Sequence, residues 1–379
     1  MKGTIVLLLL LFNSIFSQEF EHNTAFLPQG LSLPLLNGYG NSAIHNDVSN
    51  ISAINPAALG NFEKVEFGFS YQYESEIKEA WITEIGSKRI NNMVPQSVGL
   101  VLPFNNLNFA ISMNQRYNST LFTNINVANP CEAYLNENRQ FYDYVLETII
   151  YNYAFSTSYQ FENLLPNSEF SVGFRVGLNN LAEQLHIENI SYNASIYEND
   201  FSFRMLYSTN LTNNRNLSLG LYYQSPLEIS GSAKFEYKPL PYCGTDAYML
   251  HDATAEEVNL VAKFPSSLRF DLYFSQIEQF QFLFSISNSD WSKLDLYIRD
   301  QVEFSSSVSY FINKSLSFSV GFAKSEKEYV TNFMDINRNL EVVYFTAGSV
   351  FTIDDLSVNF SYADSHLSAG DFRKQQLEK

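Results

Sequence analysis

Residues 302–311 read VEFSSSVSYF, and this stretch decides the fold class. The even positions carry the apolar residues Val302, Phe304, Val308 and Tyr310. The odd positions between them carry a glutamate and serines. A period of two is the signature of a β-strand with one apolar and one polar face.

The same alternation returns along most of the chain. It is found at 65–73, 170–178, 201–207, 217–223, 280–287, 315–322 and 356–362. Turn-forming residues separate the strands near positions 105, 165, 213, 312 and 353. The sequence therefore predicts an all-β chain built from antiparallel strands.

The polar side of these strands distinguishes between two all-β architectures. A sandwich in water would be expected to carry many Lys and Glu there, whereas this face is mostly Ser, Gly, Gln and Asn with an occasional Arg. Such a face suits the inside of a transmembrane barrel, and the Phe, Val, Leu and Tyr face suits lipid. A secreted β-sandwich or adhesin with an aromatic core is the alternative.

The first seventeen residues have the layout of a secretory signal peptide. Lys2 is followed by the apolar run Ile5–Phe12 and by small residues that end at Ser17. The apolar run is shorter than the roughly 20 residues that cross a bilayer as a helix. Residues 1–17 are thus predicted to be removed, so that the mature protein leaves the cytoplasm.

The predicted barrel occupies residues 63–379. Counting alternating segments gives about thirteen strands, while single-chain bacterial barrels have even counts. We therefore expect about 14 strands, with the last one either missing from the sequence or formed poorly by residues 371–379.

Charge and cysteine content argue against a nucleic-acid-binding protein, a disulfide scaffold and a cysteine metal site. The chain carries 23 Lys+Arg against 40 Asp+Glu, a formal charge of −17 that becomes −18 once Lys2 is removed. Such an acidic chain is a poor nucleic-acid partner. Two cysteines are too few for a disulfide scaffold and lack metal-ligand spacing.

Several stretches, taken in order, resemble the FadL type of outer-membrane long-chain fatty acid transporter. SAINPAALG (52–60), after the Gly/Asn-rich LNGYGNSAIHNDVSN, is similar to the Asn-Pro-Ala segment of that family's N-terminal hatch. Three later stretches are similar to its Ser-Pro, Pro-x-Ser and Asp-Trp-Ser motifs: YYQSPLEISGSAKFEY (222–237), KFPSSLRF (263–270) and SNSDWSKLDL (287–296).

The resemblance implies a fourteen-stranded barrel whose lumen is plugged by a hatch, here residues 18–62. Pro56 fixes one backbone angle, Asn55 is able to bond neighbouring backbone groups, and Ala57 and Ala58 permit close approach to the wall. These four residues could equally just begin a short helix with Pro56 in its first turn. The two interpretations are compatible.

Alternation also predicts which charged side chains point into the lumen. Arg116, Arg175 and Arg204 are expected there as ligand-binding candidates, and Arg269 is expected beside Asp271. A carboxylate ligand would need such a cation, because an unpaired ion in a narrow lumen is costly. We favour Arg175 or Arg204 for the head group. Structural pairing with lumen carboxylates is the alternative role for each arginine.

A long outer connection is predicted over residues 118–142, and its apolar residues could offer a landing site for a ligand. It contains Cys131, and Cys243 is expected on the same outer side. In an oxidising compartment the two could form one disulfide, or both could be free, since sequence gives no distance.

The sequence predicts no enzyme. It contains no Gly-x-Ser-x-Gly, phosphate loop or paired-histidine metal motif, and its five histidines are scattered. The expected function is passive uptake of long-chain fatty acids or similar hydrophobic molecules across the Gram-negative outer membrane. The protein is expected to act as a monomer in membrane lipid, with no cofactor or metal. The alternative is a PorV-like barrel of the type IX secretion apparatus that docks secreted proteins.

Overall fold

The computed structural model describes most of the region predicted as barrel and parts of the region predicted as hatch. The described residues are 20–22, 48–49, 55–79, 87–127, 140–162, 166–187, 190–212, 215–234, 236–237, 257–277, 279–294, 300–328 and 339–364. The predicted signal peptide, residues 1–17, lies outside them, as do Cys131 and Cys243.

The described chain is almost entirely β-structure, with two short 3₁₀ helices. The helices are η2 (Pro56–Asn61) and η3 (Trp291–Lys293). The strands of the wall are β2 (Glu66–Glu79), β3 (Ser87–Phe104), β4 (Leu107–Val127), β5 (Gln140–Glu162), β6 (Ser168–Ile187), β7 (Ile190–Thr212), β8 (Arg215–Gln224), β12 (Ser267–Ile277), β13 (Phe280–Ser289), β14 (Gln301–Asn313), β15 (Leu316–Glu328), β16 (Asn339–Ile353) and β17 (Leu356–Asp364).

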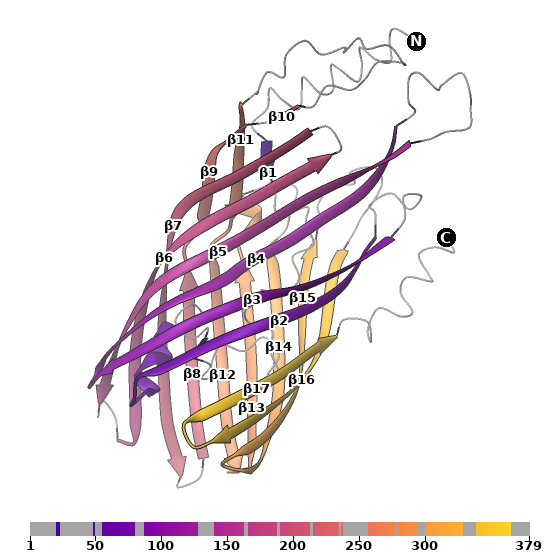
Figure 1. Ribbon diagram of the computed structural model, residues 1–379. Coiled ribbons are helices and arrows are strands. Elements are labelled where there is room, and N and C mark those ends of the chain that lie inside the picture. Colours follow the sequence, from indigo (N-terminus) through magenta and orange to yellow (C-terminus); the bar gives the residue numbers. More distant parts are fainter. Residues whose placement is uncertain are drawn as a thin grey trace, which may run out of the picture.

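These strands form one antiparallel sheet that curves into a barrel (Figure 1). The order runs β2-β3-β4-β5-β6-β7-β8-β12-β13-β14-β15-β16-β17, and the short β10 (Glu236–Tyr237) pairs only with β7. Strands β2 and β17 stand at the two ends of this order. Lys64 just before β2 and Asp355 in the turn before β17 form an ion pair of 3.2 Å, so the two ends of this order lie close together at their base.

A second, three-stranded sheet lies against the wall. The strands β9 (Leu227–Lys234) and β11 (Glu257–Phe264) pair antiparallel, and β1 (Phe20–His22) adds to the free edge of β11 in parallel. Strand β9 packs on β7. The two strands are so close at Gly231 that an added Cβ there would lie 2.8 Å from the Ile196 side chain.

The two faces of the wall differ as the alternation predicts. Outward positions are apolar and widely exposed, for example Phe174 on β6 and Phe201 on β7, whose rings stack with centroids 6.4 Å apart. The inward neighbours Arg175 and Ser202 are buried. A barrel whose outer surface is this apolar presents the face that suits lipid.

The tight turns fall where the sequence predicts them. Asn105, Asn167 and Asp354 have φ values of 54°, 59° and 52° in the turns after β3, before β6 and before β17. Asn and Asp tolerate this left-handed conformation better than other non-glycine residues. The three turns close hairpins at one end of the barrel.

Strands β4 to β7 have 20 to 23 residues each and are the longest of the wall, and they correct one prediction. β4 continues to Val127 and β5 begins at Gln140, so much of the supposed loop 118–142 is paired strand. At about 3.3 Å per residue the 23 residues of β5 extend roughly 75 Å, far beyond a bilayer. The Asn and Thr residues at positions 118–127 of the sequence interrupt the apolar alternation, so the sequence did not predict this part of the strand.

Candidate functional site

Helix η2, with Asn55 as its N-cap, is packed against the inner wall. The Asn55 side chain caps the helix by accepting a hydrogen bond of 3.2 Å from the Ala58 backbone N–H, and Pro56 stands in the first turn. Ala57 and Ala58 are fully buried. Their apolar neighbours come from three different wall strands: Val101 on β3, Ala110 on β4 and Leu206 on β7.

The contact between η2 and strand β6 depends on a glycine. A Cβ added at Gly173 would lie 2.2 Å from the Ala57 backbone nitrogen and 2.3 Å from the Pro56 carbonyl carbon. Any larger residue would push η2 off the wall. Gly173 is followed two positions later by the next inward residue, Arg175, so η2 lies beside the charged part of the lumen.

Residues 48 and 49 make a second close contact with the wall, at β2 and β3. An added Cβ at Gly99 would lie 2.2 Å from the Val48 carbonyl oxygen. Ser97 donates a hydrogen bond of 3.0 Å to the Ser49 hydroxyl and is 2.7 Å from the Ser70 hydroxyl. Two parts of the predicted hatch therefore lie on the inner face of the barrel.

The first ion cluster consists of Arg116, Arg175 and Asp200, from β4, β6 and β7. Both guanidinium groups donate to the same carboxylate oxygen of Asp200 at 2.7 Å. The Asp200 side chain is fully buried and that of Arg175 nearly so, whereas the Arg116 side chain keeps 15% of its surface exposed. Two cations share one anion, so the cluster has an excess positive charge.

Neutral side chains complete the hydrogen bonds of this cluster. Arg175 donates to the Asn152 amide oxygen at 2.6 Å and to the Ser202 hydroxyl at 2.9 Å. Arg116 donates to the Asn179 amide oxygen at 3.0 Å. The space for them comes from Gly177, where an added Cβ would lie 2.4 Å from an Asn152 amide nitrogen.

The second ion cluster consists of Arg204, Arg269 and Asp271, from β7 and β12. Arg269 donates to Asp271 at 2.9 Å, which is the pair expected from the sequence. Arg204 also pairs with Asp271 and lies over the Tyr222 ring at 5.8 Å. The side chains of Arg204 and Asp271 are fully enclosed, and that of Arg269 is 5% exposed.

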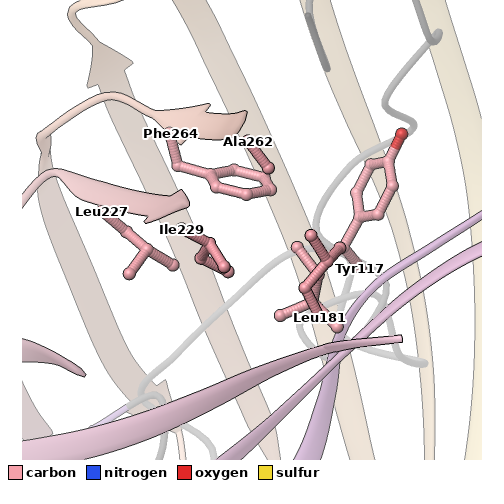
Figure 2. Close-up of a cluster of buried hydrophobic side chains, with 7 residues drawn as sticks. Tyr117, Leu181, Leu227, Ile229, Ala262 and Phe264 are labelled. Atoms are coloured by element: carbon pink, nitrogen blue, oxygen red, sulfur yellow. The ribbon is translucent and has the colours of Figure 1, made fainter. Parts of the chain in front are cut away.

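An apolar cluster adjoins the first ion cluster. Figure 2 shows side chains of β9 and β11 directed toward side chains of the wall strands β4 to β6. The members are Tyr117, Ile150, Leu181, Leu227, Ile229, Ala262 and Phe264. The Arg116 guanidinium lies over the Phe264 ring at 5.4 Å, so a cation and an apolar surface meet at this point.

The wall divides next to Arg116. Within the described ladders, β3 pairs with β4 only from Ser97 to Phe104 on β3 and from Leu107 to Asn114 on β4. Above these residues β3 pairs with β2 and β4 pairs with β5, and Figure 1 shows β3 and β4 diverging. We call this divergence the β3–β4 split.

Arg116 is the extra residue of a β-bulge at the base of the split. Gln115 pairs with Tyr151 and Tyr117 pairs with Ile150, which leaves Arg116 unpaired in the ladder. A bulge bends its strand and redirects a side chain, and such bulges are common beside functional sites. Here it directs the guanidinium to Asp200.

The three arginines named from the sequence lie on the inner face, but in two separate clusters. Arg116 and Arg175 share Asp200, whereas Arg204 belongs to the second ion cluster. Sequence reasoning missed Asp200, although it holds an inward position on a strand already recognised by its alternation. The same parity rule would have found it.

In the described part of the chain, no group of three or more His, Cys, Asp or Glu side chains is arranged to hold a metal ion. Within those same residues, no helix combines the length and the apolar character that crossing a bilayer requires.

Comparison with solved structures finds similarity to a FadL homologue and to channels for monoaromatic hydrocarbons. A Pseudomonas aeruginosa FadL homologue is 13% identical, with 90% of this chain and 89% of that chain covered and a TM-score of 0.52. The Pseudomonas putida toluene transporter TodX, as a deltaS2S3 mutant channel for monoaromatic hydrocarbons, is 13% identical with coverage of 88% and 92% and a TM-score of 0.58. The monoaromatic hydrocarbon channel CymD is 11% identical with coverage of 90% and 93% and a TM-score of 0.52. Neither the protein-family models nor the curated proteins give a match. At this identity the likeness shows a shared fold.

Proposed function

We propose that this chain, a barrel with the fold of the FadL homologue and TodX, is a passive outer-membrane uptake channel for hydrophobic small molecules. One observation carries the proposal: at the base of the β3–β4 split the buried Arg175 and the partly exposed Arg116 adjoin an apolar cluster. Arg116 contacts both Asp200 and the Phe264 ring. A site with a cation at one end and apolar side chains at the other matches an amphipathic molecule.

The outer surface of the barrel indicates where the ligand would leave it. Tyr71 and Tyr73 on β2 are 60% and 68% exposed, and they lie beside the part of β3 that has left β4. Exposed aromatic residues of this kind belong to the lipid-facing band of an outer-membrane barrel. The lower part of the split therefore faces lipid, and it is the exit that we propose for the ligand.

The substrate class that we propose is long-chain fatty acids. The two related channels with stated cargo carry neutral aromatic compounds, for which a buried cation has no use. In this chain the first ion cluster has one guanidinium more than it has carboxylates, and Arg116 keeps part of its surface exposed. A carboxylate head group would pair with the Arg116 guanidinium and balance this excess charge.

The arginines accordingly have different proposed roles. Arg116, assisted by Arg175, binds the head group. Arg204 is completely enclosed with Asp271, and we assign it to structure. The preference for Arg175 or Arg204 that sequence suggested thus shifts to Arg116, because only its bulge position leaves the guanidinium partly accessible.

The proposed path passes the predicted hatch before it reaches the split. Ligand reaches the first ion cluster from the apolar cluster, and movement of residues 48–49 and 55–61 clears the way to the split. Both described segments pack on the inner wall, at Gly99 and at Gly173. The protein works as a monomer and uses no nucleotide or metal.

The test is binding of oleate and of oleyl alcohol to the purified barrel in detergent. Arg116→Gln is expected to weaken oleate binding by roughly 10- to 100-fold, since a hydrogen bond to a charged group contributes about 1.5–3 kcal/mol. Oleyl alcohol, which has no carboxylate, should bind the variant and the parent protein equally well. Lys64→Gln, at an exposed position, is the matched control and should change neither affinity.

An equal loss of affinity for both ligands in Arg116→Gln would show that the substitution damages the whole site instead of removing one head-group contact. If the parent protein binds neither ligand, the uptake proposal fails. That result would favour a PorV-like docking role as the function.

A further inference from the structure

Gln115 on β4 is a buried amide whose nitrogen lacks a hydrogen-bond acceptor. The residue is only 3% exposed, and within the described part of the chain its Nε2 atom has no hydrogen-bond partner. Buried polar groups are nearly always hydrogen-bonded, and a buried donor without an acceptor destabilises the protein. A side chain that is kept in this state offers a contact that a ligand can complete.

Gln115 lies at the point where the wall divides. The preceding residue, Asn114, is the last β4 residue to pair with β3, and its partner is Ser97. The following residue is Arg116, the extra residue of the β4 bulge and a member of the first ion cluster. Gln115 is therefore the first residue of β4 at the β3–β4 split (Figure 1), and it adjoins the proposed head-group contact in the chain.

Gln115 and Arg116 are directed to different sides of the wall. Gln115 pairs with Tyr151, which shares its face with the outward Tyr153, a residue that is 42% exposed. Arg116 reaches inward to Asp200. Although Gln115 holds an outward position, protein encloses it almost completely. Its amide therefore lies within the thickness of the wall, between the first ion cluster and the lipid-facing surface.

A second bulge shapes the opposite rim of the split. The register of β3 with β2 shifts between Ser97 and Pro95, which leaves Gln96 as the extra residue. Pro95 has no backbone N–H, and proline within a sheet is confined to edge strands, strand starts and bulges. Both rims thus depart from the regular ladder beside Gln115, so the opening at this point is built into the backbone.

We infer that Gln115 is a second head-group contact, which receives the fatty-acid carboxylate from Arg116 as the ligand enters the β3–β4 split. The inference rests on the proposed function and adds to it a residue that recognises the head group at the exit. The Nε2 group of Gln115 donates a hydrogen bond to a carboxylate oxygen, which gives the buried amide the acceptor that the chain does not supply.

A neutral donor suits this position better than another cation would. Arg116 and Arg175 attract an anion by charge, and an ion pair at the exit would retain the ligand inside the wall. An amide offers a hydrogen bond without a countercharge. A conduction path needs sites that bind strongly enough to admit the ligand and weakly enough to release it. The order guanidinium, amide, lipid meets this requirement.

The test compares the initial uptake of oleate and of 1-octadecene by cells that carry the barrel in their outer membrane, normalised to the amount of folded barrel. Gln115→Met keeps the length of the side chain and removes the donor. It should slow oleate uptake roughly tenfold, because a hydrogen bond to a charged group is lost. Gln115→Glu should slow it further, since like charges repel. Uptake of 1-octadecene, which has no head group, should be unchanged in both variants.

Gln281→Glu is the matched control for the added charge. Gln281 lies on β13 and pairs with the buried Ser309, so it is at an inward position far along the sheet from the split. This variant should take up oleate at the parent rate. Equal slowing of both ligands in the Gln115 variants, or an unchanged oleate rate, would overturn the inference.

Binding of oleate to the purified barrel in detergent separates this inference from the proposed function. Gln115→Met should bind oleate with the parent affinity, because Arg116 and Arg175 still hold the head group in the lumen. A parent protein that binds no oleate would refute the uptake proposal. Parent binding together with an unaltered oleate uptake rate in Gln115→Met would refute only the role of Gln115.

Discussion

Arg116 on β4 and Asp200 on β7 are joined by an ion pair of 2.7 Å that crosses the inside of the barrel, past the two strands between them. The pair connects the bulge at the base of the β3–β4 split to β7, the strand against which β9 packs. Arg175 meets the same oxygen of Asp200, also at 2.7 Å. The wall is therefore held together at the point where we propose that ligand passes.

Removal of this shared carboxylate should be costly. Asp200→Ala leaves two largely buried guanidinium groups without their anion, and breaking a buried ion pair in this way typically destabilises by about 3–5 kcal/mol. Denaturant unfolding of the purified barrel measures the loss. Asp355→Ala, at an exposed carboxylate, is the matched control and should leave the unfolding midpoint unchanged.

The seating of η2 should depend on Gly173. Gly173→Ala places a methyl group 2.2 Å from the Ala57 backbone nitrogen, so the helix must move away from β6. We expect faster proteolysis within residues 18–62 while the barrel itself stays intact. In Gly60→Ala the new methyl group meets the flexible end of Gln160 at 3.1 Å, and the digestion rate should change little. Equal digestion of both variants would mean that η2 is not held by this contact.

The connection after β13 should respond to acid. Lys293 donates a hydrogen bond to Asp290, which holds the pKa of that carboxyl below its ordinary value of 3.8. A lowered pKa means that the contact is complete above the ordinary value and is lost as pH falls through the lowered one. Fluorescence of Trp291 in a Trp81→Phe background should report this transition.

The Lys293→Ala variant supplies the comparison for the acid transition. Its midpoint should rise toward the ordinary carboxyl value, because the stabilising hydrogen bond is gone. A midpoint that is the same with and without Lys293 would show that another group controls the change in Trp291 fluorescence.

The ion pair that joins the two ends of the sheet should contribute little. Lys64 and Asp355 are 74% and 91% exposed at the side chain, and such pairs are weakened by solvent screening. Lys64→Ala should therefore unfold at the same denaturant concentration as the parent protein. A clear shift of the midpoint would indicate that this contact controls how β2 and β17 approach each other.

Much of the wall was accessible from the sequence because a strand in a barrel has only two faces. The period of two in FSVGFRVGL places Arg175 inside and Phe174 outside, and the structure agrees. The turn at Asn167 could also be predicted from the sequence, since few other residues adopt its positive φ.

The site itself was less accessible, because it arises from departures from that period. The bulge at Arg116 changes which side chains face inward beyond it. No local sequence pattern predicts that one strand contains an extra residue at this point. The pairing of Arg175 with Asp200 joins residues 25 positions apart. Strand β9 lies against β7, with Gly231 next to the Ile196 side chain, and alternation alone does not predict this contact.

Identification of the molecules that copurify with the barrel tests the central claim most directly. Mass spectrometry of an organic extract should find fatty acids in near-stoichiometric amount from the parent protein and less from Arg116→Gln. An extract without acyl chains, together with a bound protein partner, would contradict uptake and favour the docking role.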